Sequence, residues 1–246
     1  MHIREQPPRK ALLLAAGRGE RLRPITETTP KCLVPINGRP LLYYWIDHLC
    51  SSGADKIIIN THYLADQVKR ACEELELKHR LTLCFEQQLL GTAGTLAAQR
   101  KELQSENFWF VHADNLSMFN TQAFIKSFVT RPRDCVGTMM SFHAEHPEQC
   151  GTILCDNNGV LKEYFEKLDN PKTNLANGAV FIFDSRIFDI LESINNPFDF
   201  CRDVVPKLLG RMNTFMNDGY HRDIGTVESY LRAVEDFRCY DQEKSL

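Results

Sequence analysis

Apolar residues in the first part of the chain follow two alternating patterns. Short continuous apolar runs alternate with stretches in which apolar residues return every three or four positions, which is the helical period. The runs predict strands at 10–15, 57–59, 81–85, 108–111 and 135–142. The periodic stretches predict helices at 41–49, 68–75, 95–103 and 121–128, the last capped by Asn120. Because strands that alternate with helices form right-handed crossovers, we expect a mostly parallel sheet covered on both faces.

The pattern changes after Pro147. Two short strands at 152–155 and 160–166 flank an Asp-Asn-Asn-Gly turn, which predicts a hairpin. Three further elements are expected: a strand at 179–183, a helix at 185–192 capped by Asp184, and a last helix at 226–237 capped by Thr226. The sequence therefore predicts an α/β fold: a doubly wound, mostly parallel, Rossmann-like sheet with a small antiparallel extension.

Composition excludes several classes of protein. The 246 residues are 43% hydrophobic and 25% charged, which excludes disorder, and a net charge of -3 argues against nucleic-acid binding. No apolar stretch approaches the roughly 18 residues of a membrane span, and the early run at 11–16 is shorter than a signal-peptide core. We expect a cytoplasmic protein that binds no membrane. The nine cysteines form no Cys-x-x-Cys pair, so we expect free, buried thiols.

A glycine-containing segment follows the first strand. Gly17 and Gly19 let backbone N–H groups approach phosphate oxygens, and Arg21 and Lys31 add positive charge. The alternative is an ordinary surface turn, which the surrounding basic residues and prolines disfavour. A polyphosphate therefore fits this segment.

Two common phosphate-binding motifs are excluded at this segment. A dinucleotide fingerprint needs a third glycine where Leu22 stands, and an acidic residue at the end of the second strand, which is Asn60. A P-loop needs Gly-Lys-Ser/Thr, which the segment does not contain.

Two aspartates, Asp114 and Asp223, each follow an apolar run. A carboxylate at the end of a strand can hold Mg²⁺, and two of them suit one ion that keeps waters and substrate oxygens as its other ligands. The alternatives are a turn cap for Asp114 and an interaction of Asp223 with the N-terminus of the next helix.

Two further segments carry polar side chains at strand ends. Glu166 can accept hydrogen bonds from hydroxyl groups and Lys167 offers a point charge to a phosphate, although a solvated surface pair is the alternative. The segment 86–95 follows the third strand, and its alternative interpretation is a loop with a helix cap at Thr92.

Together these segments resemble the sugar-1-phosphate nucleotidylyltransferases, which make NDP-sugars, over residues 10–236. The resemblance is strongest to guanylyltransferases that act on mannose or heptose 1-phosphate. It implies the nucleotide-diphospho-sugar transferase type of Rossmann-like fold in one domain, 1–246. Within it, 10–145 would bind the NTP, and 146–246 would bind the sugar phosphate and carry the C-terminal helix.

The resemblance implies a Mg²⁺-dependent enzyme and a role for each matched residue. The catalytic residues would be Arg21, Lys31, Asp114 and Asp223. The NTP-binding residues would be Ala16, Gly17, Gly19, Arg21, Lys31, Gln88, Gly91 and Thr92. The sugar-phosphate-binding residues would be Gly151, Glu166, Lys167 and Asn177. The ligands of Mg²⁺ would be Asp114 and Asp223.

The substrates implied are an NTP and a sugar 1-phosphate. GTP is expected because Glu86, Gln87 or Gln88 could accept the two donors on the guanine edge. Three alternatives stay open: a uridylyl or other nucleotidyl transfer to a different sugar phosphate, transfer to a phosphocholine-like acceptor, and a non-catalytic subunit that senses an NDP-sugar. The oligomeric state is open, and a homodimer is compatible with the sequence.

Overall fold

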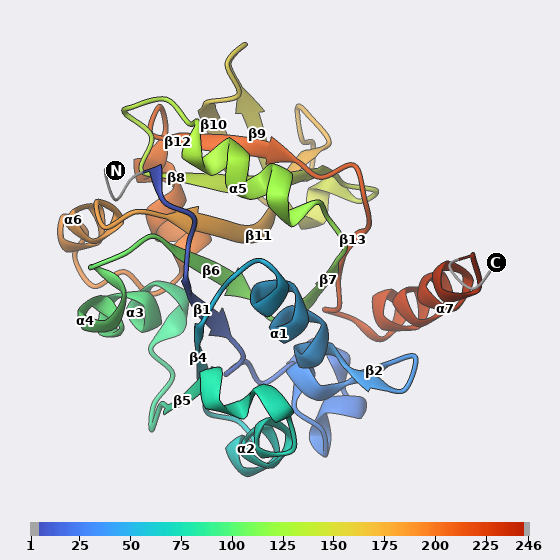
Figure 1. Cartoon of the computed structure of the whole chain (residues 1–246). Coiled ribbons are helices and arrows are strands. Elements are labelled where there is room, and N and C mark those ends of the chain that lie inside the picture. Colours follow the sequence, from blue (N-terminus) through green and yellow to red (C-terminus); the bar gives the residue numbers. More distant parts are fainter. Residues whose placement is uncertain (1–4, 244–246) are drawn as a thin grey trace. The chain divides into compact units, whose positions relative to one another are not determined.

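Two strands, β1 (Lys10–Leu14) and β6 (Phe108–His112), each contribute residues to two compact units of the chain. The computed structural model describes residues 5–243, with side chains described as far as residue 238 (Figure 1). The first unit comprises the residues up to 12, 90–111 and 119–218, and the second comprises 13–89, 112–118 and the residues from 219 onward. In the described part, no helix is both long and apolar enough to span a membrane.

The first unit contains a mixed sheet. Its strands besides β6 are β8 (Gly137–His143), β9 (Gly151–Cys155), β10 (Leu161–Glu166), β11 (Leu175–Phe183) and β12 (Met212–Met216). Antiparallel pairing joins β10 to β9, and β11 to β9, β6 and β8, which confirms the predicted hairpin after Pro147. Strand β12 pairs with β8 in parallel. The apolar pattern does not predict β12, because polar Asn213 and Thr214 interrupt the run.

The helices of the first unit differ from the prediction at two places. They are α3 (Gly91–Ala98), α4 (Arg100–Leu103), α5 (Thr121–Val129) and α6 (Ile187–Glu192). The single helix expected at 95–103 is wrong, since it begins at Gly91 and is divided at Gln99. The cap at Asn120 is confirmed, because its Oδ1 accepts a hydrogen bond from the backbone of Ala123 at 2.9 Å.

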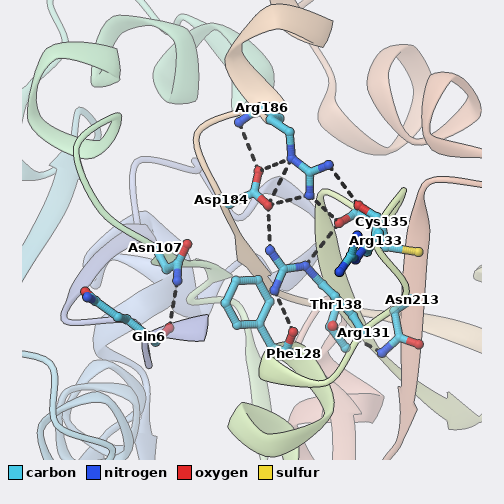
Figure 2. A network of polar contacts seen from close by, with 10 residues as sticks. All are labelled: Gln6, Asn107, Phe128, Arg131, Arg133, Cys135, Thr138, Asp184, Arg186 and Asn213. Carbon is cyan, nitrogen blue, oxygen red and sulfur yellow. Dashed lines mark hydrogen bonds and ion pairs between the residues drawn. The ribbon is translucent and has the colours of Figure 1, made fainter. Parts of the chain in front are cut away.

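Asp184 is not the N-cap residue of α6, which begins at Ile187 after Arg186, but its Oδ1 accepts from the backbone N–H of Arg186 at 3.0 Å in the turn before the helix. Asp184 also forms an ion pair of 2.5 Å with the guanidinium of Arg131, whose side chain is fully buried. Arg131 also donates to the backbone carbonyls of Phe128 and Cys135, at 2.6 and 3.1 Å. Figure 2 shows Arg186 approaching the same carboxylate, at 2.7 Å. The carboxylate therefore serves the turn before α6 and the buried charge of Arg131 together, and a buried guanidinium needs such a charged partner.

The second unit contains the parallel pair β4 (Lys56–Thr61) and β5 (Leu81–Phe85), with β1 beside β4. Its helices are α1 (Leu41–Ser51), α2 (Ala65–Glu73) and α7 (Val227–Glu243). Two short antiparallel ribbons complete it: β2 (Pro35–Ile36) with β3 (Arg39–Pro40), and β7 (Asn115–Ser117) with β13 (His221–Asp223). The expected cap of the last helix is confirmed, because Thr226 Oγ1 accepts from the backbone of Ser229 at 3.2 Å.

A hydrophobic cluster in the second unit connects its distant segments. Buried side chains from the segment after β1, from β7 and from α7 pack together, among them Leu22, Leu116, Ile224 and Phe237. Leu22 and Phe237 are more than 200 positions apart, so the cluster packs three distant segments of the second unit against one another.

The single domain and its expected parts, 10–145 for the NTP and 146–246 for the sugar phosphate, stay predictions. The two compact units divide the chain at other places, since 90–111 and 119–145 group with later residues. All eight cysteines whose side chains are described are free, but only Cys32, Cys72 and Cys135 are buried. The side chain of Cys239 lies outside the described residues.

Candidate functional site

The ribbon formed by β7 and β13 brings Asp114 and Asp223 together in the second unit. In its register Asp223 pairs with Asn115, and the backbone N–H of Ile224 donates to the carbonyl of Asp114 at 2.9 Å. Trp45 Nε1 supports the ribbon from α1 by donating to the carbonyl of Asn115 at 2.8 Å. Residues 109 positions apart in the sequence therefore present adjacent carboxylates.

Lys31 lies against both carboxylates. Its Nζ is 2.9 Å from Asp114 Oδ2 and 3.5 Å from Asp223 Oδ1, and only 9% of its side chain is exposed. A 3-10 turn at Lys31–Leu33 points the side chain inward, since the residue itself is buried. Arg21 Nη2 is 3.8 Å from Asp223 Oδ2. All four residues predicted to be catalytic thus form one cluster, which we call the aspartate–lysine cluster.

The charges in this cluster shift one another's pKa values. Burial raises the pKa of Asp114, but the neighbouring Lys31 ammonium outweighs burial and lowers that pKa to about 2. Burial also raises the pKa of Asp223, and Lys31 offsets this only in part. For Lys31, burial lowers the pKa, whereas the carboxylates of Asp114 and Asp223 raise it further, so the net shift is upward. The cluster therefore holds Asp114 ionised and Lys31 protonated at neutral pH.

The donor set fits a magnesium ion that arrives with its substrate. Among the described residues, no group of three or more His, Cys, Asp or Glu side chains could hold a metal ion. Mg²⁺ is commonly bound by one or two carboxylates, with waters and substrate phosphates as its other ligands. Asp114 and Asp223, each about half exposed, match that pattern better than a complete protein cage.

The two glycines after β1 have different surroundings. Gly19 has a φ of +62°, and a Cβ there would lie 2.8 Å from Thr26 Cγ2 and 3.1 Å from Lys31 Cβ. Gly19 is therefore required by the packing of its own segment. A Cβ at Gly17 would meet no atom within 4 Å, which leaves its backbone open to a ligand. The neighbouring Ala16 is buried.

Asn60 connects the ends of three strands in the second unit. Its Oδ1 accepts from the backbone of Ala15 at 2.7 Å, just after β1, and its Nδ2 donates to Glu86 Oε1 at 2.9 Å, just after β5. Glu86 is buried, whereas Gln87 and Gln88 are exposed. From the sequence alone, Asn60 counts only as evidence against dinucleotide binding, and its connecting contacts to Ala15 and Glu86 are not predicted. The one sequence feature that points to these contacts is its position at the end of the second strand.

The predicted residues Gly91 and Thr92 lie in the first unit, at the start of α3. Gly91 has a φ of +73°, and a Cβ there would lie 2.3 Å from the carbonyl oxygen of Phe198. The same carbonyl accepts from Ala93 N at 3.0 Å, and Thr92 Oγ1 accepts from Phe200 N at 2.6 Å. The segment at 198–200, which the sequence did not single out, therefore holds this turn in place.

The four residues predicted to bind the sugar phosphate lie on β9, β10 and β11 or directly after them. Glu166 pairs with Gly151 across the hairpin, and Lys167 Nζ lies 3.8 Å from Glu166 Oε1. Asn177 stands at an irregularity of β11, where its Oδ1 accepts from Ala179 N at 2.9 Å.

Two residues near this group have a left-handed backbone although they are not glycines. They are Lys167, with a φ of 49°, and Ala179, with a φ of 54°. Such conformations cost about 1–3 kcal/mol each and are concentrated at functional sites. The two strained residues are therefore at, or within two positions of, residues predicted to bind the sugar phosphate: Lys167 is one of them, and Ala179 follows Asn177.

Comparison with known proteins places the chain among nucleotidyl transferases. The family model described as "Nucleotidyl transferase" matches residues 10–238. Among curated relatives, the mannose-1-phosphate guanylyltransferase catalytic subunit beta of Drosophila melanogaster is 29% identical over 231 residues, which are 92% of this chain and 62% of the relative. The chain thus spans about three fifths of the length of such relatives.

Solved structures give the same result for the fold. HddC from Yersinia pseudotuberculosis is 25% identical with a TM-score of 0.78, and the match covers 93% of this chain and 99% of HddC. HddC complexed with GMP-PN matches over the same shares at 25% identity, with a TM-score of 0.77. The predicted α/β class, with its Rossmann-like sheet and antiparallel extension, is confirmed. The protein belongs to the nucleotidyl transferase family.

Proposed function

We propose that this protein transfers a nucleoside monophosphate from an NTP to a sugar 1-phosphate, giving an NDP-sugar and pyrophosphate. The observation that carries the proposal is the aspartate–lysine cluster, in which Lys31 and two carboxylates meet beside Arg21. Membership of the family, and relatives named as guanylyltransferases, support it.

The chemistry requires the alignment of two anions. An oxygen of the sugar phosphate attacks the α-phosphorus, a new P–O bond forms, and the bond to pyrophosphate breaks with its electron pair remaining on pyrophosphate. The sugar phosphate is already ionised at neutral pH, so no general base is required. The barrier is therefore lowered mainly by positioning and by neutralising charge.

Each basic residue has a proposed task. Arg21 stabilises the charge that builds up on the leaving pyrophosphate, and Lys31 binds the NTP phosphates. Lys167, whose side chain is 58% exposed, binds the phosphate of the sugar. Asp114 and Asp223 would hold Mg²⁺, which would add positive charge at the phosphate oxygens.

Guanine is the proposed base. Its exocyclic amine and ring N–H are donors, and Glu86, fixed by Asn60, offers a carboxylate acceptor. The loss of one hydrogen bond to such a charged acceptor with the wrong base costs about 1.5–3 kcal/mol. A relative named as a mannose-1-phosphate guanylyltransferase and the solved complex of HddC with GMP-PN support this choice, with a manno-configured sugar 1-phosphate as acceptor.

A grid of NTPs against sugar 1-phosphates, scored by pyrophosphate release, tests the function. GTP is expected to exceed UTP and dTTP by roughly 10- to 100-fold in kcat/KM, following the cost of a lost hydrogen bond to a charged acceptor. A pyrimidine nucleotide that wins by tenfold would overturn the guanine assignment alone. Pyrophosphate release with phosphocholine, but with none of the sugar 1-phosphates, would show that the acceptor is not a sugar phosphate. NDP-sugar binding without any turnover would favour a sensing subunit.

Removal of divalent metal is expected to stop the reaction. Excess chelator should abolish pyrophosphate release, and added Mg²⁺ should restore it, because the two aspartates can supply only part of an ion's coordination. A parallel assay with the chelator already saturated by Mg²⁺ controls for effects of the chelator itself. Full activity in excess chelator would contradict the two-aspartate metal site.

Substitutions of Lys31 and Lys167 are expected to change different kinetic constants. Lys167→Ala should raise the KM for sugar phosphate about tenfold or more, the scale of a lost charged hydrogen bond, and leave the KM for NTP little changed. Lys31→Ala should impair NTP use and kcat instead. Lys162→Ala is the matched control, because this exposed lysine lies on β10, the strand that Lys167 directly follows, and pairs with Asp156. The reverse pattern would mean that the two phosphate sites are exchanged.

A further inference from the structure

A tyrosine on β10 contacts the carboxylate that is proposed to bind the sugar. The phenol of Tyr164 donates a hydrogen bond to Glu166 Oε2. The two side chains lie on the same face of β10 because alternate residues of a strand share a face. The hydroxyl also lies across Gly151, where a Cβ would be only 2.3 Å from it. The absence of a side chain at Gly151 therefore makes room for the phenol.

A cysteine contacts the proposed sugar-binding asparagine. Cys201 lies in the short π-helix Phe200–Val204, and its Sγ is 3.3 Å from Asn177 Nδ2, which donates to it. Each of the two proposed sugar-binding side chains, Glu166 and Asn177, therefore has one polar partner of its own, Tyr164 and Cys201 respectively.

The protonation state of the two partner groups suits this arrangement. Burial, followed by the neighbouring Cys201 and Glu166, raises the pKa of the Tyr164 phenol. Burial, followed by the carboxylates of Asp199 and Glu166, raises the pKa of the Cys201 thiol. The phenol therefore remains a donor to the carboxylate, and the thiol remains neutral and able to accept from the amide.

The π-helix that carries Cys201 is itself firmly held. Its first residue, Phe200, donates its backbone N–H to Thr92 Oγ1 at 2.6 Å. The ring of Phe200 packs edge-on against Phe110 and Phe181, with centroid distances of 4.8 and 5.2 Å. Cys201 therefore projects from a fixed backbone, and π-helical turns of this kind are frequent at functional sites.

We propose that Tyr164 and Cys201 are positioning residues for sugar recognition, with Tyr164 fixing the carboxylate of Glu166 and Cys201 fixing the amide of Asn177. This inference rests on the proposed function, because it assigns these contacts to the sugar 1-phosphate. A Glu carboxylate has several rotatable bonds, so a fixed orientation reduces the entropy lost when a sugar hydroxyl binds. The two fixed side chains, Glu166 and Asn177, then determine which pattern of hydroxyl groups is accepted.

The first test removes the hydroxyl of Tyr164 alone. Tyr164→Phe is expected to raise the KM for the accepted sugar 1-phosphate about tenfold, with kcat and the KM for NTP changed by less than about twofold. Tyr43→Phe is the matched control, because its hydroxyl donates to a backbone carbonyl, that of Ala71, at 2.8 Å. An unchanged KM for the sugar phosphate in Tyr164→Phe would overturn the inference.

The second test asks whether Tyr164 acts through Glu166. In a Glu166→Gln background, Tyr164→Phe should add less than about a twofold further change, because residues that act through one another are not additive. Independent, multiplying effects would overturn the positioning role.

Cys201 provides a test that does not depend on the tyrosine variant folding. Cys201→Ala should raise the KM for sugar 1-phosphate severalfold, and Cys201→Ser, which keeps a hydrogen-bonding group, should recover most of that loss. Equal KM values in wild type and Cys201→Ala would contradict the inference.

The outcome for wild type separates the inference from the proposed function. Wild-type turnover in the substrate grid, combined with unchanged KM values in the variants, overturns only the positioning roles. A wild type that transfers to no sugar 1-phosphate overturns the proposed function, and the inference with it.

Discussion

Replacing Asp223 with asparagine is expected to reduce kcat for nucleotidyl transfer by roughly 100-fold or more while the fold stays intact. The carboxylate lies 3.5 Å from Lys31 Nζ and 3.8 Å from Arg21 Nη2, so its loss removes a charge from the centre of the aspartate–lysine cluster. The removal of one preorganised polar group from an active site costs on the order of 10²–10³ in rate. The amide has nearly the same shape, and the register that pairs Asp223 with Asn115 is a backbone pairing in which the Asp223 side chain takes no part.

Steady-state pyrophosphate release and thermal unfolding together check this prediction. The midpoint of unfolding should stay close to that of wild type, while kcat falls. Asp218→Asn is the matched control, since Asp218 is exposed and precedes β13 by only a few residues. A wild-type rate for Asp223→Asn would show that the residue serves only the entry to α7.

Asp184→Ala is expected to destabilise the protein by about 3–5 kcal/mol, because it leaves the fully buried guanidinium of Arg131 without its carboxylate. Because the carbonyls of Phe128 and Cys135 would still accept from Arg131, we expect a loss of unfolding free energy nearer to about 3 than to about 5 kcal/mol. For a chain of this size, a loss of about 3 kcal/mol lowers the melting temperature by roughly 6–12 °C. Thermal or urea unfolding followed by circular dichroism measures the change.

Asp169→Ala provides the comparison for this prediction. Asp169 is exposed in the segment after β10, so its replacement should change the free energy of unfolding by no more than about 0.5 kcal/mol. Equal stabilities for the two variants would mean that the carbonyls of Phe128 and Cys135 are enough to compensate the Arg131 guanidinium for the loss of the buried ion pair.

Elements with a strong local signal could be predicted from the sequence. β5 matches the predicted bounds, and the caps at Asn120 and Thr226 are present. These features depend on interactions between residues only a few positions apart. The periodic apolar residues of α1 likewise determine which of its faces is buried.

Features that depend on distant partners could not be predicted. The start of α3 at Gly91 depends on the carbonyl of Phe198, which accepts from Ala93 N. The buried ion pair of Asp184 depends on Arg131, 53 positions earlier in the sequence. No local pattern indicates either partner. Asp114 and Asp223 could be named from the sequence as a pair of candidate metal ligands, but no local pattern shows that they are adjacent, because their adjacency depends on the β7–β13 ribbon.

The β7–β13 ribbon also has a consequence for how the protein is made. The second unit draws on residues 13–89, 112–118 and those from 219 onward, whereas the first unit is complete at residue 218. During synthesis from the N-terminus, the first unit can fold while β13 and α7 are still inside the ribosome. Asp114 therefore gains its partner carboxylate only after a further 109 residues have been made. A chain that lacks residues 221–224 would hold only one of the two carboxylates, and so could not assemble the proposed metal site.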